Sequence, residues 1–115
     1  MSDSVVERMR EVLVQRVEAI DKILEHPIPP NDYVIQVSPG LWLTSIEERG
    51  PDRGGPIVHT GDILNARVTS ANKAHILLQI AARTARASWS AHVRADALVA
   101  ERQRALILLA RKKTS

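Results

Sequence analysis

The chain has 115 residues, of which 44% are hydrophobic and 25% are charged, and its net charge is +3 at pH 7. This balance is typical of a globular domain and excludes a wholly disordered chain. No apolar run approaches the roughly 18 residues of a membrane span, the first residues lack the pattern of a secretory signal, and the absence of cysteine excludes disulfides and thiol chemistry. We therefore expect a single cytoplasmic domain over residues 1–115 that does not contact a membrane.

Residues 1–26 are predicted to form a helix. Ser4 and Glu7 have the spacing of a capping box, and apolar residues then recur every three or four positions from Val6 to Leu24. The helix ends before Pro27, because the residue that precedes a proline is disfavoured in the α region. The apolar stripe is either a core-facing surface or the seam of a short coiled coil, and its short length favours the core.

Residues 27–68 are predicted to form a small antiparallel meander of three or four strands. Every glycine and every proline of the chain lies between positions 27 and 61, where these residues punctuate turns. The β-prone runs are residues 33–37, 41–46, 56–59 and 63–68, and the last two are joined by an expected hairpin turn at residues 60–62. Such a sheet needs a helix on one face to be stable.

Residues 69–115 are predicted to be helical, because they contain neither glycine nor proline. We favour one long or kinked helix over residues 71–112, which would be about 63 Å long. The alternative is a helical hairpin that bends near Ser88, Trp89 and Ser90. The fold class is therefore α+β, and a rod of this length would extend beyond a compact domain, which suggests a partner chain.

Small residues dominate the second half of the chain, since 13 of the 14 alanines lie between positions 66 and 110. An alanine-rich core buries little area per residue, so we expect a homo-oligomer. The apolar run 105–110, which is followed by three cations, fits packing or an oligomer seam better than a membrane surface. The predicted interface is one face of the long helix, made of Leu77, Ala81, Ala91, Ala95, Leu98 and Leu109.

Positive charge is concentrated in the same half of the chain: residues 1–62 carry a net charge of −5 and residues 63–115 a net charge of +8. A second helical face carries a stripe of polar and basic side chains. Guanidinium groups bind phosphates in a bidentate manner, so the stripe predicts a site for a nucleotide or nucleic acid. The alternative is a solvated face or one that packs on the acidic half. The stripe consists of His75, Gln79, Arg83, Arg86 and Arg94.

The sequence offers no set of catalytic residues. The glycine-rich loop 48–55 lacks the Gly-Lys-Ser/Thr ending of a phosphate-binding loop. The four histidines do not have metal-ligand spacing. Ser88, Ser90 and His92 lie close together without a nucleophile elbow. We therefore expect a protein that is not an enzyme and has no catalytic residues, no metal and no cofactor.

The middle of the chain resembles Ead-like small accessory proteins of phages and prophages over roughly residues 38–106. The resemblance is carried by five short matches, at Ser38-Pro39-Gly40-Leu41-Trp42, Gly61-Asp62-Ile63-Leu64, Asn72-Lys73-Ala74-His75-Ile76, Ala81-Ala82-Arg83 and the leucine-containing stretch 98–106. It implies a phage or prophage setting and a non-essential accessory role. It transfers no catalytic or binding residue.

These observations predict a non-catalytic, oligomeric phage accessory binding protein in the cytoplasm of the host cell. It would act on a host component as a counter-defence protein, either by sequestering an anionic ligand or by blocking a host protein. Two alternatives stay open. One is a nucleic-acid-binding regulatory protein that uses the basic C-terminal half, and the other is a virion or scaffold component.

Overall fold

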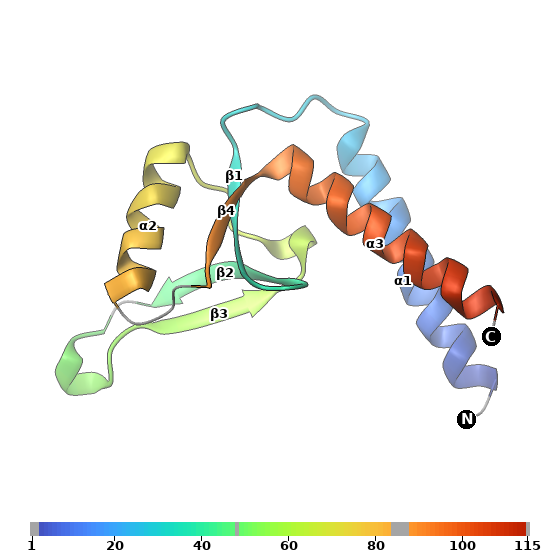
Figure 1. Ribbon diagram of the computed structural model, residues 1–115, viewed down its shortest axis with the longest axis horizontal. Helices are drawn as coiled ribbons and strands as arrows, with labels where there is room; N and C mark the ends of the chain where they lie inside the picture. Colours follow the sequence, from blue (N-terminus) through green and yellow to red (C-terminus); the bar gives the residue numbers. More distant parts are fainter. Residues whose placement is uncertain (1–2, 48, 84–87, 115) are drawn as a thin grey trace.

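The computed structural model describes residues 3–47, 49–83 and 88–114 (Figure 1). Helix α1 (Asp3–Leu24) begins and ends close to the positions expected from its apolar repeat and from Pro27. Strands β1 (Tyr33–Ser38) and β2 (Leu41–Glu47) form a hairpin, and Gly40 turns the chain between them with a φ of +79°. A side chain at this φ would be strained, so glycine suits the turn.

The sheet has four antiparallel strands in the order β3-β2-β1-β4. Strand β3 (Ile57–Gly61) pairs with β2 along its length, from Ile57 opposite Glu47 to Gly61 opposite Trp42. The expected turn at residues 60–62 is therefore wrong, because Thr60 and Gly61 belong to the strand. The α+β class is confirmed.

Residues 63–68 do not form the expected strand. The chain instead enters the 3-10 turn η2 (Ile63–Asn65), because the carboxylate of Asp62 accepts a hydrogen bond from the backbone N–H of Leu64 at 3.1 Å. This cap favours a helical turn over an extended chain. The turn also places Ile63 in the core.

A single helix over residues 71–112 is also wrong, and so is a helical hairpin. The region contains helix α2 (Ala71–Arg83), strand β4 (Ser90–Val93) and helix α3 (Arg94–Thr114). Strand β4 satisfies its backbone against β1, and Trp89 just before it is buried under α2. Burial of the indole and pairing of the strand outweigh the helical propensity of the surrounding alanines. Because residues 71–112 do not form one long rod, no overhanging helix requires a partner chain to cover it.

Both faces of the sheet are covered, which gives two separate cores. On one face, α1 and α3 pack on β1 and β2, with Ile20 and Leu98 against Val34 and Trp42. On the other face, α2 packs on the sheet through Leu77 and its neighbours. Because both faces of the sheet are covered, its strands carry consecutive apolar residues and do not alternate strictly between apolar and polar ones.

Helices α1 and α3 lie antiparallel and extend away from the sheet, so that both ends of the chain lie at one end of the molecule (Figure 1). We call these two helices the arm. The radius of gyration is 16.5 Å, compared with about 13 Å for a compact chain of this length. The arm makes the molecule elongated, with extents of 49 × 36 × 18 Å.

Candidate functional site

The predicted ligand-binding stripe is divided among separate elements. His75 and Gln79 are exposed on α2, where Gln79 Nε2 and His75 Nε2 lie 3.1 Å apart in a hydrogen bond. Arg83 is the last residue of α2, whereas Arg94 begins α3 beyond strand β4. Arg86 lies outside the described residues. A single helical face for these five side chains is therefore wrong, because it requires an unbroken helix from 75 to 94.

The predicted oligomer interface lies largely inside the protein. Leu77 and Ala81 belong to the core beneath α2, and Leu98 is fully buried against α1 and the sheet. Ala91 is half-buried on β4, where it packs against the core beneath α2. The interface is wrong for Leu77, Ala81 and Leu98, because Leu77 and Ala81 face the sheet from α2 while Leu98 faces the other core from α3. The remaining two, Ala95 and Leu109, are half-buried on α3.

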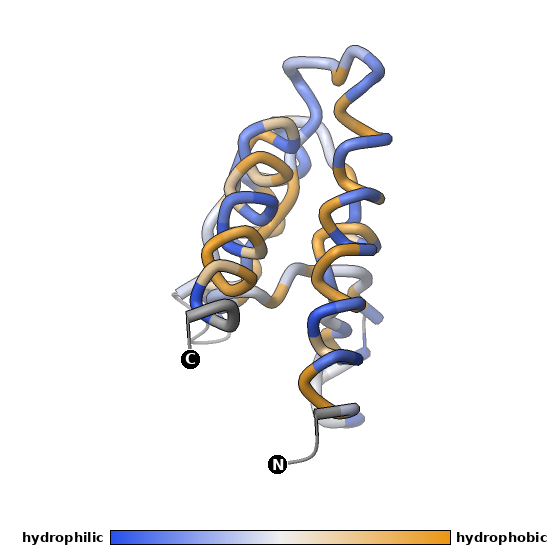
Figure 2. Tube along the Cα trace, turned by 90° about the vertical axis from the view of Figure 1, so that its right-hand side faces the viewer, coloured by the Kyte–Doolittle hydropathy of each residue, from blue (hydrophilic) through white to orange (hydrophobic). Residues whose placement is uncertain are grey.

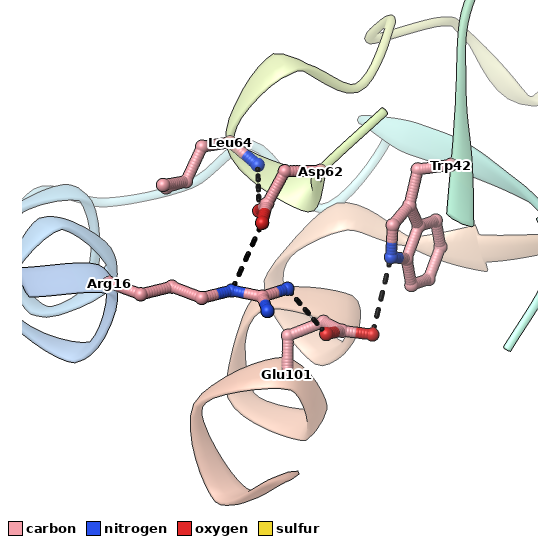
Figure 3. Close-up of polar contacts among 5 residues, drawn as sticks. All are labelled: Arg16, Trp42, Asp62, Leu64 and Glu101. Carbon is pink, nitrogen blue, oxygen red and sulfur yellow. Dashed lines mark hydrogen bonds and ion pairs between the residues drawn. The ribbon is translucent and has the colours of Figure 1, made fainter. Parts of the chain in front are cut away.

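A partly buried ionic cluster joins the arm to the sheet (Figure 3). Arg16 Nη2 of α1 donates a hydrogen bond to Glu101 Oε2 of α3 at 2.8 Å. Trp42 Nε1 of β2 donates to the other carboxylate oxygen, Glu101 Oε1, at 3.2 Å. Arg16 Nε lies 3.2 Å from Asp62 Oδ2 as an ion pair that is not aligned as a hydrogen bond. One guanidinium therefore links α1, α3 and the start of η2.

The cluster is a structural connection, because Glu101 is 4% exposed and both of its oxygens are engaged. The carboxylate therefore ties α1 and β2 to α3 through hydrogen bonds from Arg16 and Trp42. The cluster was not predicted from the sequence, although a signal was present: Arg16 lies three residues after Leu13 and four before Ile20, on the apolar face of α1, and Glu101 lies between Leu98 and Ala105. Opposite charges on two apolar faces indicate that those faces meet.

A serine–histidine pair lies on β4. Ser90 Oγ and His92 Nε2 are 2.8 Å apart. The His92 ring packs edge-on against the Trp42 indole, with the ring centroids 5.6 Å apart at an interplanar angle of 75°. The aromatic contact orients the imidazole, and among the residues that the structure describes no carboxylate is hydrogen-bonded to the ring in the way that the aspartate of a catalytic triad is.

The glycine-rich loop 48–55 connects β2 to β3, as a plain hairpin connection would. Within its described part, the 3-10 turn η1 (Pro51–Arg53) follows Gly50, whose carbonyl oxygen accepts hydrogen bonds from Arg53 N at 2.9 Å and Gly55 N at 3.2 Å. Across the described ranges 3–47, 49–83 and 88–114, no group of three or more histidine or acidic side chains is arranged to hold a metal ion.

The arm carries exposed apolar surface on both of its sides. One groove between the helices is lined almost entirely by apolar atoms of Met9, Val12, Leu13 and Leu108, with Arg8 at its edge. We call this the arm groove. Met9 is 47% exposed and Val12 is 62% exposed. A second groove on the other side is lined by Arg10, Val14, Leu106, Leu109 and Ala110. Hydrophobic positions recur along both helices toward the ends of the chain (Figure 2).

A further groove, the α2 groove, lies between α2 and strand β2. Its apolar residues are Ile46, Ile76, Leu77 and Ile80, and its polar residues are Arg67, Ser70, Asn72 and Lys73. Leu77 forms a buried floor, whereas Ile76 on the rim is 54% exposed. The site thus combines an aliphatic surface with two cations.

Searches of protein-family models, curated proteins and solved structures find no match to this chain. Within the ranges that the structure describes, no helix combines the length and the hydropathy needed to cross a lipid bilayer.

Proposed function

We propose that this chain is a non-catalytic binding protein that assembles as a homodimer through the arm. Following the resemblance to phage and prophage accessory proteins, we further propose that it acts on a host component in the host-cell cytoplasm. The observation that carries the assembly is the arm groove, where Met9, Val12 and Leu108 expose apolar surface next to one another. Contiguous apolar surface of this kind marks interaction sites on soluble proteins.

The size of the arm suits a dimer interface. Helix α1 has 22 residues and is therefore about 33 Å long, and two packed helices present a face about 20 Å wide. A contact over one face of the arm would bury about 660 Å² on each copy. The total of about 1,300 Å² falls within the range of specific protein–protein interfaces.

The charges of α1 lie mostly outside the arm groove. Arg8 stands at the edge of the groove, whereas Glu7, Arg10 and Glu11 line a separate pocket of the same helix. In a twofold-symmetric contact the same surface meets itself, so the apolar groove of one copy would face that of the other with Arg8 at the edge. The pairing of two arms would form a four-helix bundle with the apolar groove closed inside.

The assembly is tested by analytical ultracentrifugation of the wild type and of Val12→Glu. We expect a dimer for the wild type. The substitution removes roughly 1 kcal/mol of apolar burial per copy, so the dimer dissociation constant should rise at least 30-fold. Val68→Glu, at an exposed valine outside the arm, is the matched control and should stay dimeric. A monomeric wild type, or a Val12→Glu variant that dimerises normally, would refute the proposal.

The host component is tested by native mass spectrometry of the protein purified from infected host cells. We expect a mass larger than that of the homodimer, because a binding protein that acts on a host component should retain it. A homodimer recovered without any additional mass would contradict this part of the proposal and would leave the assembly through the arm intact.

A further inference from the structure

We propose that the α2 groove is the docking site for an acidic amphipathic helix of a partner protein. Such a helix would place aliphatic side chains on Ile76, Leu77 and Ile46 and carboxylates toward Arg67 and Lys73. This inference rests on the proposed function only in taking the chain to be a binding protein, since the α2 groove is separate from the arm.

The apolar part of the groove fits the side of a helix. Leu77 supplies the floor at 7% exposure, Ile46 and Ile80 form half-buried walls, and Ile76 stands at the rim. The residues contributed by α2 run from Asn72 to Ile80, which is more than two turns and about 12 Å. Leucine-type anchors spaced three and four positions apart on a partner helix would match this length.

The arrangement of the sheet favours a helix over an extended peptide. Helix α2 packs against β1 and β4, and the groove opens between α2 and Ile46 of β2, on the same face of the sheet. A helix placed there would lie beside α2 and on the face of β2, as neighbouring helices do in layered folds. An added strand would instead pair at an outer edge of the sheet, on β3 or β4, and β2, which carries Ile46, is not an edge strand.

The electrostatics of the groove select for acidic partners. Neither Asp nor Glu is among the described residues that line it, and the stretch 63–83 contains no acidic residue at all. The first turn of α2 also lacks an acidic side chain, so its positive end is capped by the neutral Ser70 hydroxyl and not by a carboxylate. The nearby Glu47 of β2 accepts two hydrogen bonds from Arg49, at 3.2 Å and 3.0 Å. Arg67 and Lys73 are thus the charges that a ligand meets.

The residue types argue against nucleic acid as the occupant. Single strands bind where aromatic side chains stack on bases beside a basic track, whereas the α2 groove is lined by isoleucine and leucine. A phosphate group would engage the two cations and leave the apolar rim at Ile76 exposed. An amphipathic helix satisfies both parts of the site at once.

The probe is a fluorescein-labelled synthetic helical peptide with leucines at positions i, i+3, i+4 and i+7 and glutamates flanking them. Its control peptide has lysine in place of each glutamate. Fluorescence anisotropy with the full-length protein should show binding of the glutamate peptide, at least 10-fold tighter than that of the lysine peptide. Equal affinities, or no binding of either peptide, would overturn the inference.

Two variants test the location. Ile76→Asp should abolish binding of the glutamate peptide, because it puts a carboxylate on the exposed rim without disturbing the buried floor. The double variant Arg67→Glu/Lys73→Glu should reverse the preference toward the lysine peptide by about 10-fold. Arg53→Glu, at an exposed arginine in the β2–β3 loop, is the control for charge alone and should keep the wild-type preference. Wild-type binding by Ile76→Asp would overturn the inference.

The variant Val12→Glu separates this inference from the proposed dimer. If the peptide binds this variant as it binds the wild type, the α2 groove acts independently of assembly. A dimeric wild type that binds neither peptide would refute docking of an acidic helix in the α2 groove and would leave the proposed dimer intact. If the wild type is a dimer and the double variant Arg67→Glu/Lys73→Glu is a monomer, the α2 groove is occupied by a second copy of the chain, and the proposed partner is wrong.

Discussion

Replacement of Arg16 by methionine should lower the free energy of unfolding by about 3 kcal/mol. The side chain of Glu101 is 5% exposed, and without Arg16 it keeps only the hydrogen bond from Trp42 Nε1. Removal of one partner of a buried ion pair costs about 3–5 kcal/mol, because the other charge stays desolvated. We take the lower value because Arg16 is 22% exposed and water can approach Glu101 from its side.

The effect should be non-additive with a change at Glu101. Glu101→Gln alone leaves Arg16 with only Asp62, whereas the double variant Arg16→Met/Glu101→Gln contains neither buried charge. The double variant should therefore lose about 1–2 kcal/mol less than the sum of the single variants. Urea unfolding followed by circular dichroism measures these differences, and the slope with urea should stay unchanged if only the folded state is affected.

The control is the second ion pair between α1 and α3, from Arg102 to Asp21. Its two side chains are 37% and 45% exposed, so Arg102→Met should cost less than about 1 kcal/mol. If Arg16→Met destabilises the protein no more than Arg102→Met does, Arg16 does not stabilise the buried Glu101 carboxylate. The absence of a coupling free energy in the double-mutant cycle of Arg16→Met and Glu101→Gln would contradict this role as well.

Further substitutions test the fold. Leu98→Ala should lower the free energy of unfolding, measured in urea, by about 2–5 kcal/mol and leave the oligomeric state unchanged, because Leu98 is fully buried within the protein. An unchanged free energy of unfolding together with an altered oligomeric state would contradict this. Gly40→Ala and Gly54→Ala should each cost about 1–2 kcal/mol, because both glycines have a positive φ and the Arg104 Nη1 atom 2.8 Å from a Cβ at position 40 ends an exposed side chain that can move aside; an unchanged stability of either variant would refute the backbone strain. Ser70→Ala should lower the melting temperature by several degrees, since its hydroxyl accepts from Lys73 N at 3.3 Å, and an unchanged melting temperature would exclude a capping role.

Local patterns predicted the elements whose stability depends on near neighbours in the chain. The apolar repeat of residues 6–24 and the proline at 27 located α1, and the β-prone runs between turn residues located β1, β2 and β3. The sequence failed at residues 63–68, where the β-branched and apolar residues suggested a strand. There the carboxylate of Asp62 caps a turn instead, and that preference depends on where Ile63 can be buried.

The candidate sites were harder to predict than the elements. The predictions of the arginine stripe and of the oligomer face both required a helix that continues through residues 84–93. Strand β4 interrupts that helix, so neither stripe lies on one helical face. Apolar side chains such as Leu77 and Leu98 signal burial, and the periodicity does not reveal whether the burying surface is another copy or the chain's own sheet. The exposed apolar surface lies instead at Met9, Val12 and Leu108, where two distant segments meet.

The sequence by itself determined that this protein is an α+β chain with an amphipathic first helix, a turn-rich β region and a basic, alanine-rich second half, because periodicity, capping and turn residues act over a few positions. Only the tertiary structure decided that residues 90–93 leave the helical region to pair with β1, and that Arg16 meets Glu101 and Trp42. These outcomes depend on pairings between positions 54 to 85 residues apart, whose free energy comes from burial and hydrogen bonds that form only when the chain folds.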